Sequence, residues 1–121
     1  MDKEFVPYEP SLALKELEFN EPCLGNFADD EKHTLFTNGN RPGKIDAPTF
    51  SQAFRWFREK YKIHSIINLT IIGTWYFELY DLNDKRNAEI KTNQNEFETP
   101  EEAELACLIK LIEIVKEKKN G

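Results

Sequence analysis

Three stretches of the chain carry apolar residues at the spacing of an amphipathic helix, which is three or four residues. Residues 9–18 place Ala13, Leu14 and Leu17 on one side. Residues 49–61 form one broad apolar face, which consists of Phe50, Ala53, Phe54, Phe57 and Tyr61. A third helix begins near residue 99, and its apolar side holds Ala103, Cys107, Leu108, Leu111, Ile112, Ile114 and Val115. The pattern therefore predicts three helices that each bury one side.

The second and third helices begin with capping sequences. Thr49 is followed three residues later by Gln52, and Thr99 is followed by Glu102. A threonine hydroxyl at such a position can accept a hydrogen bond from the backbone N–H three residues on, and the Gln or Glu side chain can accept one from the backbone N–H of the threonine. Pro100 suits the first helical position, because its missing N–H has no partner there in any case. These signals place each helix start just after its threonine.

Residues 63–72 and 74–82 predict two long strands, because both stretches are rich in β-branched and aromatic residues. Gly73 between them marks a turn or a bulge. In the second strand two sets of side chains alternate, Trp75, Phe77 and Leu79 with Tyr76, Glu78 and Tyr80. One face is therefore core and the other is half polar and aromatic. Weaker patterns predict a hairpin formed by residues 23–27 and 33–37, and a further strand over residues 87–92.

Together these elements predict an α+β fold in the order α-β-β-α-β-β-(β)-α. We expect a two-layer sandwich in which a curved antiparallel sheet carries the second and third helices on one face. At 121 residues the chain has the length of one domain, so we expect a single α+β domain over residues 1–121. The hydrophobic fraction of 40% and the charged fraction of 31% are typical of a globular protein.

The net charge of −6 is unevenly distributed, with −7 over residues 1–31, +5 over residues 32–62 and −4 over residues 63–121. An acidic chain argues against general coating of DNA, because phosphate contacts dominate nucleic-acid affinity. The sequence contains no run of about 18 apolar residues that could span a membrane. The charged amino terminus is not followed by an apolar signal segment. We therefore expect no membrane contact and a cytoplasmic location.

No set of residues has the spacing of a catalytic or metal-binding motif. His33 and His64 stand outside any such motif, and Cys23 and Cys107 do not form a C-x-x-C pair. Cys107 falls in the apolar stripe of the third helix, where a free thiol behaves as a small hydrophobic group. Glu78 could be a tuned carboxylate between tyrosines, but a solvent-facing strand acid is the simpler interpretation. We expect no enzyme activity, no metal and no cofactor.

Four segments carry a resemblance to known proteins: residues 12–17 (LALKEL), 20–24 (NEPCL), 47–61 (APTFSQAFRWFREKY) and 97–108 (FETPEEAELACL). Together they resemble a family of small uncharacterised bacteriophage and prophage proteins over nearly the whole chain. The helix–strands–helix half is also similar in layout to the phage α-β-α sandwich domain. The family has no assigned activity or catalytic residues. The resemblance therefore implies a mobile genetic element and the host cytoplasm, and it implies no mechanism.

Six residues form the candidate interaction surface: Arg55, Trp56, Arg58, Lys62, Tyr76 and Tyr80. Trp56 lies on a flank of the second helix, away from its apolar face, and aromatic residues are enriched in binding hot spots. The alternative is that the first helix or the first hairpin covers Trp56. We interpret the chain as a non-catalytic protein-interaction or accessory module, whose partner is an unknown protein or a second copy of the chain.

Nucleic-acid binding is the second interpretation. Arg55, Arg58 and Lys62 form a basic stripe on one flank of the second helix, so they could follow phosphates while nearby tyrosine rings stack on bases. The alternative is that the stripe forms ion pairs with acidic residues 1–31 and 98–104. The acidity of the whole chain favours the ion pairs.

Overall fold

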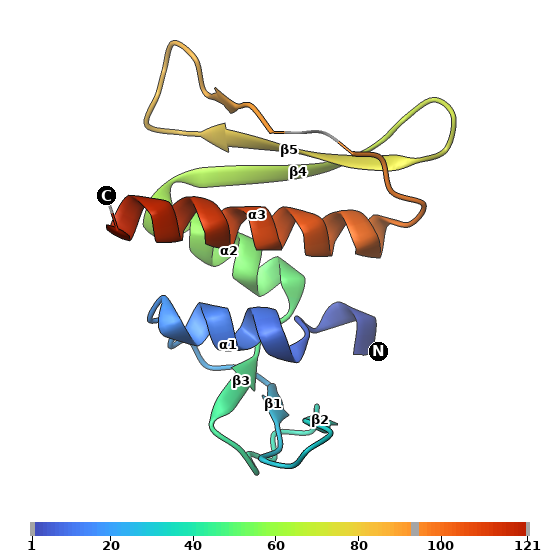
Figure 1. Ribbon diagram of the computed structural model, residues 1–121, viewed down its shortest axis with the longest axis vertical. Coiled ribbons are helices and arrows are strands. Elements are labelled where there is room, and N and C mark those ends of the chain that lie inside the picture. The colour runs from blue at the N-terminus through green and yellow to red at the C-terminus, as the bar shows by residue number, and fades with distance from the viewer. Residues whose placement is uncertain (1, 93–94, 121) are drawn as a thin grey trace. The chain divides into compact units, whose positions relative to one another are not determined.

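A computed structural model of the protein describes residues 2–92 and 95–120. Within these ranges the chain forms three α-helices and six short or medium strands, so the predicted α+β class is confirmed. Contacts within the chain group it into two compact units, Met1–Gln52 and Ala53–Gly121. Figure 1 shows the elements of each unit in the order of the chain.

The first unit combines one helix with a small antiparallel sheet. A 3-10 turn, Asp2–Glu4, precedes helix α1, Tyr8–Glu16. The strands are β1, Gly25–Phe27, β2, Leu35–Phe36, and β3, Ile45–Ala47, in the order β2-β1-β3. Both pairs in this sheet are antiparallel. Helix α2, Phe50–Tyr61, starts at the end of this unit and continues into the second.

Aromatic and aliphatic side chains join α1 to this sheet. Phe5, Phe27, Ile45 and Ala47 form a buried cluster, against which Tyr8 of α1 packs. The Tyr8 ring meets the Phe27 ring edge-on at a centroid distance of 5.5 Å. Because strands of two or three residues bury little apolar surface themselves, the packed helix supplies much of the burial in this unit.

The second unit is built on a longer antiparallel sheet. Strands β4, Ile63–Leu69, and β5, Trp75–Asp81, pair along their full lengths, from Ile63 opposite Asp81 to Leu69 opposite Trp75. The short strand β6, Glu89–Ile90, extends the sheet in the order β4-β5-β6. Helix α3, Pro100–Asn120, follows and closes the unit.

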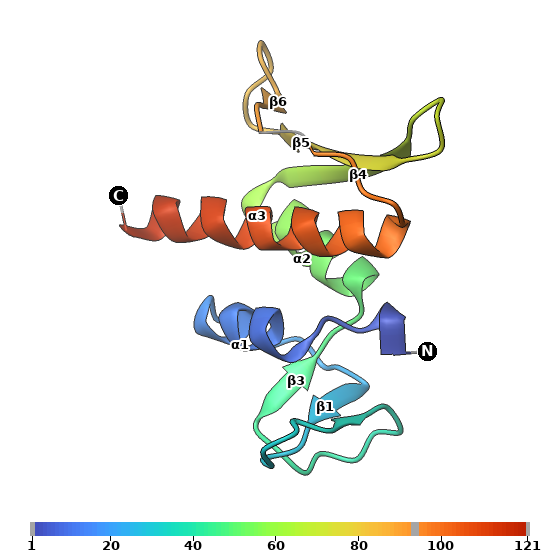
Figure 2. The same ribbon diagram turned by 45° about the vertical axis from the view of Figure 1, so that its right-hand side comes forward.

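Helix α3 packs on one face of this sheet and leaves the other face open. Ile63, Phe77 and Leu79 point to the helix and are buried. Because side chains alternate along a strand, Tyr76, Glu78 and their neighbours point to the other face. In Figures 1 and 2, α2 and α3 lie on the same side of the β4–β5 pair, and no described element of this unit covers the opposite side. The predicted placement of both helices on one side of the strands agrees with these views.

The predicted threonine caps are confirmed at both helix starts. The backbone N–H of Gln52 donates to Thr49 Oγ1 (3.1 Å), and that of Glu102 donates to Thr99 Oγ1 (3.2 Å). The Thr99 hydroxyl also donates to the Glu102 carboxylate (3.0 Å). The Gln52 side chain takes a different partner from the expected one, because its amide donates to the Pro22 carbonyl oxygen (2.8 Å). Gln52 thus ties the start of α2 to the chain entering β1.

Two details of the predicted fold are wrong. The described residues form two separate three-stranded sheets in place of one curved sheet. Strand β3 is missing from the predicted order, because a segment of three residues is too short to show an alternation of apolar and polar positions. The predicted strand over residues 87–92 is present but short, as β6. The sequence also predicts a connecting loop over residues 93–98, of which residues 93 and 94 lie outside the described ranges. The single domain stays a prediction.

No helix among residues 2–92 and 95–120 is both long enough and apolar enough to cross a membrane.

Burial of Cys107 should make stability depend on alkaline pH. Burial raises the pKa of this thiol from 9.0 to about 12, with the negative charge of Glu104 adding to the rise and a hydrogen bond with Ser65 opposing it. Since the folded pKa exceeds the unfolded value, the stabilising contribution is complete below about pH 9 and is lost as the pH rises toward 12. We expect the free energy of unfolding to fall more steeply above pH 9 in the native protein than in Cys107→Ala. Urea denaturation at a series of pH values measures both slopes, and equal slopes would contradict the burial.

Candidate functional site

The open face of the β4–β5–β6 sheet carries an unusual mixture of aromatic, polar and aliphatic side chains. Three directly opposed pairs form it, His64 with Tyr80, Ile66 with Glu78, and Asn68 with Tyr76. All six residues are half-buried. Opposed side chains on one face of an antiparallel pair lie close enough to interact. The open face is therefore a continuous surface about three residue pairs long.

The carboxylate of Glu78 is held in place at the middle of this face. The Asn68 amide donates to Glu78 Oε1 (2.9 Å), and the Tyr80 hydroxyl donates to Glu78 Oε2 (2.9 Å). The hydrogen bond to Glu78 is the main cause of a raised pKa at Tyr80. Each carboxylate oxygen retains further acceptor capacity. The arrangement can therefore receive a hydrogen-bond donor or a cation from a partner, next to tyrosine rings.

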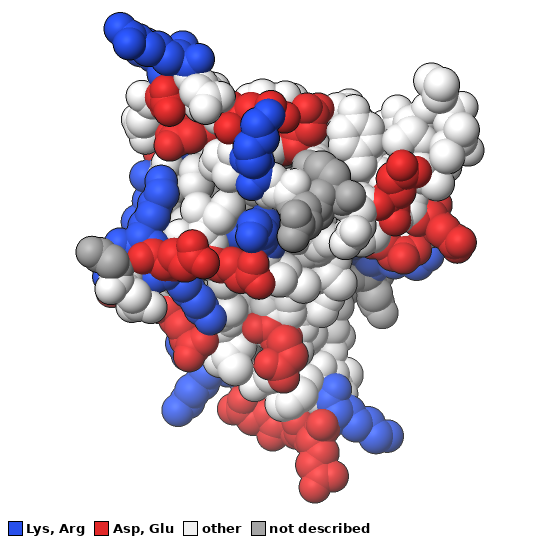
Figure 3. All heavy atoms as spheres, turned by 45° about the horizontal axis from the view of Figure 1, so that its top comes forward, with Lys and Arg blue, Asp and Glu red and all other residues white. Residues whose placement is uncertain are grey.

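A hydrogen-bonded turn at residues 70–74 connects β4 to β5 and presents isoleucines to solvent. The Thr70 N–H donates to the Thr74 carbonyl oxygen (2.7 Å), and the Thr74 N–H donates to Thr70 Oγ1 (3.1 Å). The two threonine hydroxyls also share a hydrogen bond (2.7 Å), and Gly73 has a φ of 91°. Ile71 and Ile72 are 104% and 76% exposed. Figure 3 shows no charged atoms at the upper right end, where this turn lies in Figure 1.

We call Leu69, Ile71 and Ile72 the hairpin tip. Leu69, the last residue of β4, is 57% exposed and adds a third aliphatic side chain to the two in the turn. Turns are usually built from glycine, proline, asparagine, aspartate and serine, which tolerate water. Three large aliphatic side chains together at an exposed turn are therefore a feature that folding of this unit does not require.

Trp56 is not exposed, so its prediction as a surface residue is wrong. Its side chain is 6% exposed, and its ring meets the rings of Phe57 and Tyr61 edge-on at centroid distances of 5.0 and 5.4 Å. The Lys60 ammonium lies 5.2 Å from the Trp56 ring centroid, in the range of a cation–π contact. The buried part of the helix surface is wider than its most apolar face and includes the flank on which Trp56 lies. The helical pattern therefore predicts an exposed Trp56, although this side chain is buried.

The remaining predicted surface residues do not form one surface. Arg55 and Arg58 are exposed on α2, which lies on the α3 side of the sheet in Figures 1 and 2. Tyr76 and Tyr80 belong to the open face, on the other side of the sheet. Lys62 is exposed at the junction of α2 and β4, where its φ of 59° ends the helix. The expected combination of a basic stripe with stacking tyrosines is therefore absent from the described residues.

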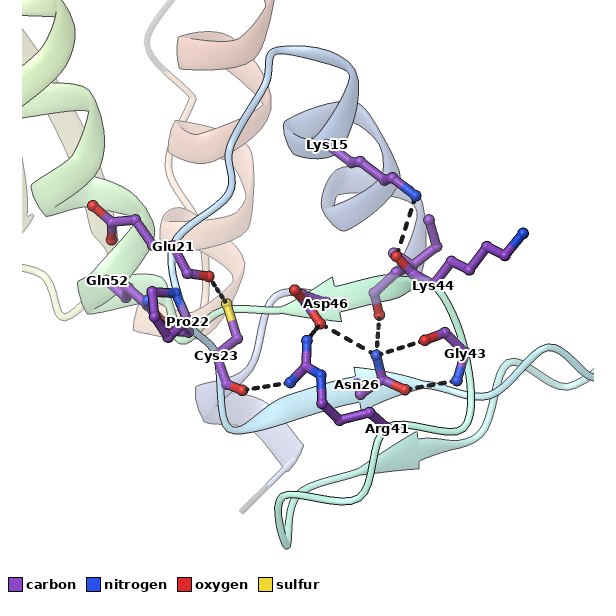
Figure 4. Close-up of polar contacts among 11 residues, drawn as sticks. Lys15, Glu21, Pro22, Cys23, Asn26, Arg41, Gly43, Lys44, Asp46 and Gln52 are labelled. Carbon is purple, nitrogen blue, oxygen red and sulfur yellow. Dashed lines mark hydrogen bonds and ion pairs between the residues drawn. The ribbon is translucent and has the colours of Figure 1, made fainter.

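A second polar arrangement, in the first unit, was not predicted. Asn26 of β1 is completely buried, and Figure 4 shows its amide facing the segment that leads into β3. The Asn26 amide nitrogen donates to the carbonyl oxygens of Gly43 (3.1 Å) and Ile45 (3.3 Å) and to the Asp46 carboxylate (3.2 Å). The Gly43 N–H donates back to Asn26 Oδ1 (2.9 Å). A side chain at Gly43 would place its Cβ 1.9 Å from the Phe27 carbonyl oxygen, so this close approach requires glycine.

Arg41 and Cys23 lie at the edge of this arrangement. The Arg41 guanidinium forms an ion pair with Asp46 and donates to the Cys23 carbonyl oxygen (3.0 Å). The Cys23 thiol donates to the Glu21 carbonyl oxygen (3.3 Å), and burial, followed by the charge of Asp46, raises its pKa to about 11. A thiol with a raised pKa is a poor nucleophile, because the thiolate is the reactive form. These contacts fix loops and provide no activated nucleophile.

A small cavity of about 200 Å³ lies beside this arrangement, and its lining residues are Ser11, Lys15, Phe19, Asn20, Lys44 and Asp46. The Lys15 ammonium donates to the Lys44 carbonyl oxygen (3.2 Å), so one of the two lysines already has a partner in the chain. Among the residues that the structure describes, no group of three His, Cys, Asp or Glu side chains could hold a metal ion.

Comparisons of the chain with protein-family models, with curated proteins and with solved structures each found no match.

Replacing Asn26 should destabilise the protein more than replacing an exposed asparagine. In Asn26→Ala the Gly43 N–H and the Ile45 carbonyl lose a buried partner, and each such loss costs about 1–3 kcal/mol. We expect the free energy of unfolding to fall by about 2–4 kcal/mol in urea denaturation. The control is Asn38→Ala, because Asn38 accepts one hydrogen bond in an exposed turn. Equal losses in the two variants would contradict a clamping role for Asn26.

Removing the Glu78 carboxylate should lower the pKa of Tyr80. In Glu78→Ala the hydrogen bond that is the main cause of the raised pKa disappears, so the tyrosine should titrate closer to its ordinary value of 10.0. The ring carbon resonances of Tyr80, followed by NMR against pH, measure the change. Glu89→Ala is the control, because Glu89 acts on Tyr80 through charge alone and is a smaller cause. A larger change in the control would show that Glu78 is not positioned as described.

Proposed function

We propose that the chain is a non-catalytic protein-interaction or accessory module that binds its partner through the hairpin tip and the adjoining open face. The proposed setting is the host-cell cytoplasm, as the resemblance to phage and prophage proteins implies. No catalytic role is proposed.

The exposure of the hairpin tip is the observation that carries the proposal. Burying a large aliphatic side chain is worth about 1.5–3 kcal/mol relative to leaving it in water. Ile71 is fully exposed and Ile72 is 76% exposed, so the two side chains gain little of this within the chain. Groups of exposed apolar side chains mark interaction sites on soluble proteins. A partner that covers the tip would recover this free energy.

The open face supports the same proposal from a different direction. Tyr76 and Tyr80 belong to the residue type that is enriched in interface hot spots, and both sit beside the fixed Glu78 carboxylate. The hydrogen bonds from Asn68 and Tyr80 hold this carboxylate before any partner arrives, so little freedom is lost on binding. Along the chain, Asn68 of the open face is followed directly by Leu69, whose side chain points to the α3 side, and then by the turn that carries Ile71 and Ile72.

This surface keeps the two tyrosines of the predicted surface and replaces its other members. Trp56 is not part of the proposed binding surface because it is buried. Arg55 and Arg58 are not part of it because they belong to a helix on the other side of the sheet. The nucleic-acid alternative depended on cations beside exposed rings, and nothing in the described geometry favours it over a protein partner. The net charge of −6 also opposes phosphate binding.

Charges placed on the hairpin tip should abolish partner binding. We expect Ile71→Asp/Ile72→Asp to retain its fold, since both side chains are exposed, and to lose bound partners because carboxylates cannot be buried in an apolar contact. Affinity-tagged protein captured from cells that carry the gene, followed by quantitative mass spectrometry, measures the loss.

The matched control is Asn83→Asp/Asn87→Asp, which adds the same charge at two exposed residues between β5 and β6. Partners retained by the control and lost from the tip variant support the proposal. If both variants capture the same proteins as the native chain, the hairpin tip is not the binding surface. Thermal denaturation of all three proteins checks that each is folded.

A further inference from the structure

The two edges of the β4-β5-β6 sheet differ in length and in charge. Strand β6 has two residues, and Glu89 pairs there with Lys91 at 2.8 Å. Strand β4 has seven residues and pairs with β5 on one side, with no strand on its other side among the described residues. Natural proteins protect sheet edges with short strands, charges or proline. The β6 edge has this protection, and the β4 edge has none of it.

The pairing pattern identifies the backbone groups that β4 presents at its outer edge. The Thr70 N–H bonds to Thr74, and the Leu82 N–H bonds to the Lys62 carbonyl oxygen, so even-numbered residues of β4 face β5. In an antiparallel pair the bonded residues alternate along the strand. The N–H and C=O groups of the odd-numbered residues therefore point outward, and these residues are Ile63, Ser65, Ile67 and Leu69.

The same segment is the longest part of the chain without charge. Residues 63–77 contain no Asp, Glu, Lys or Arg, although 31% of all residues are charged. Ile66 and Ile67 in the middle of β4 are only half-buried, whereas Phe77 beside Ile67 is 5% exposed. The β4 edge thus offers both free backbone groups and uncovered aliphatic surface.

We propose that the β4 edge binds the β4 edge of a second copy of this chain, in antiparallel pairing about a twofold axis through Ile66. In this register every residue of β4 has a partner. Ile63 lies opposite Leu69 of the second copy, His64 opposite Asn68, Ser65 opposite Ile67, and Ile66 opposite Ile66. The outward N–H and C=O groups of the odd-numbered residues then meet one another, as an antiparallel pair requires. The two sheets become one sheet of six strands.

The self-complementary register of β4 selects a second copy as the occupant. Each molecule carries a net charge of −6, so two copies repel each other, and this repulsion is weakest where they meet through neutral surface. The β4 edge is such a surface, and a twofold contact through it places no charged side chain of β4 opposite another. His64 can donate to the Asn68 Oδ1 of the second copy, because the amide nitrogen of Asn68 is engaged by Glu78. The contact is isologous and ends at the dimer, since the β6 edges are short and charged.

This inference deepens the proposed interaction role by naming one partner, and it rests on that role only in being a protein contact. It uses the β4 edge, which shares Ile66 with the open face and Leu69 with the hairpin tip, whereas the capture experiment changes Ile71 and Ile72, which lie outside β4. Loss of capture in Ile71→Asp/Ile72→Asp should therefore leave the dimer mass unchanged. A native chain that is monomeric but still captures partners through the tip would overturn this inference alone, so the two proposals can fail separately.

The experiment exploits the position of Ile66 on the twofold axis. In Ile66→Lys two ammonium groups oppose each other, and in Ile66→Glu two carboxylates do, so each variant alone should associate at least about tenfold more weakly than the native chain. An equal mixture should restore the dimer, because Lys then faces Glu. Size-exclusion chromatography with light scattering over a series from about 1 to 100 µM measures the mass at each concentration, and thereby the Kd of each protein. Native mass spectrometry of the mixture identifies the mixed dimer.

The matched control is Ile109→Lys, which makes the same change at an exposed isoleucine of α3. We expect the native chain and this control to reach twice the chain mass of 14.2 kDa, and each Ile66 variant to reach it only at a concentration at least about tenfold higher. A native chain that stays monomeric, an Ile66 variant with the Kd of the native chain, a control that associates more weakly than the native chain, or a mixture without the mixed dimer would each overturn the proposal. Circular dichroism melting of each variant confirms that it is folded, and an unfolded Ile66 variant is replaced by Ile66→Arg or Ile66→Asp.

Discussion

The packing of α3 against one face of the β4–β5 pair is the constraint on which the second unit depends. It buries Ile63, Phe77 and Leu79, and the alternation of a strand then sends their neighbours to the opposite face. The same alternation governs the backbone, because the residues of β4 that point to α3 are those whose N–H and C=O groups face outward at the edge. The alternation of odd and even positions along the strands therefore determines which side chains are buried, which lie on the open face and which backbone groups of β4 face outward at the edge.

Long periodic segments were predictable from the sequence because their burial pattern repeats many times. The two later helices begin where their threonine caps place them, and β5 carries the expected alternation. Trp56 was misplaced because a helical period gives the most apolar direction and does not give the width of the buried arc. The tip isoleucines were assigned to a strand, since β-branched residues fit strands and the turn around Gly73 shortens both strands at that end.

The first unit was harder to predict because its order depends on polar contacts between distant segments. Strands of two or three residues have no period, and β3 is held to β1 partly by the amide of Asn26. Nothing local in the sequence distinguishes this buried asparagine from those in the surface loops. The nearest signal is the glycine at 43, whose lack of a side chain lets the backbone reach Phe27. Such pairings form only when distant segments meet in the folded chain, so patterns among neighbouring residues do not predict them.

The threonine pair at the base of the hairpin tip has a consequence for the kinetics of the proposed binding. Thr70 and Thr74 are joined through backbone and hydroxyl groups, so the loop between them has few conformations left to lose. A partner would meet Ile71 and Ile72 already displayed in their bound arrangement, and encounter would not wait for the loop to reorganise. Selection among partners would then depend on the shape of the pocket that receives two adjacent branched side chains. A hairpin tip of fixed shape would bind only partners whose pocket matches its isoleucines, whereas a flexible loop would adapt to many surfaces.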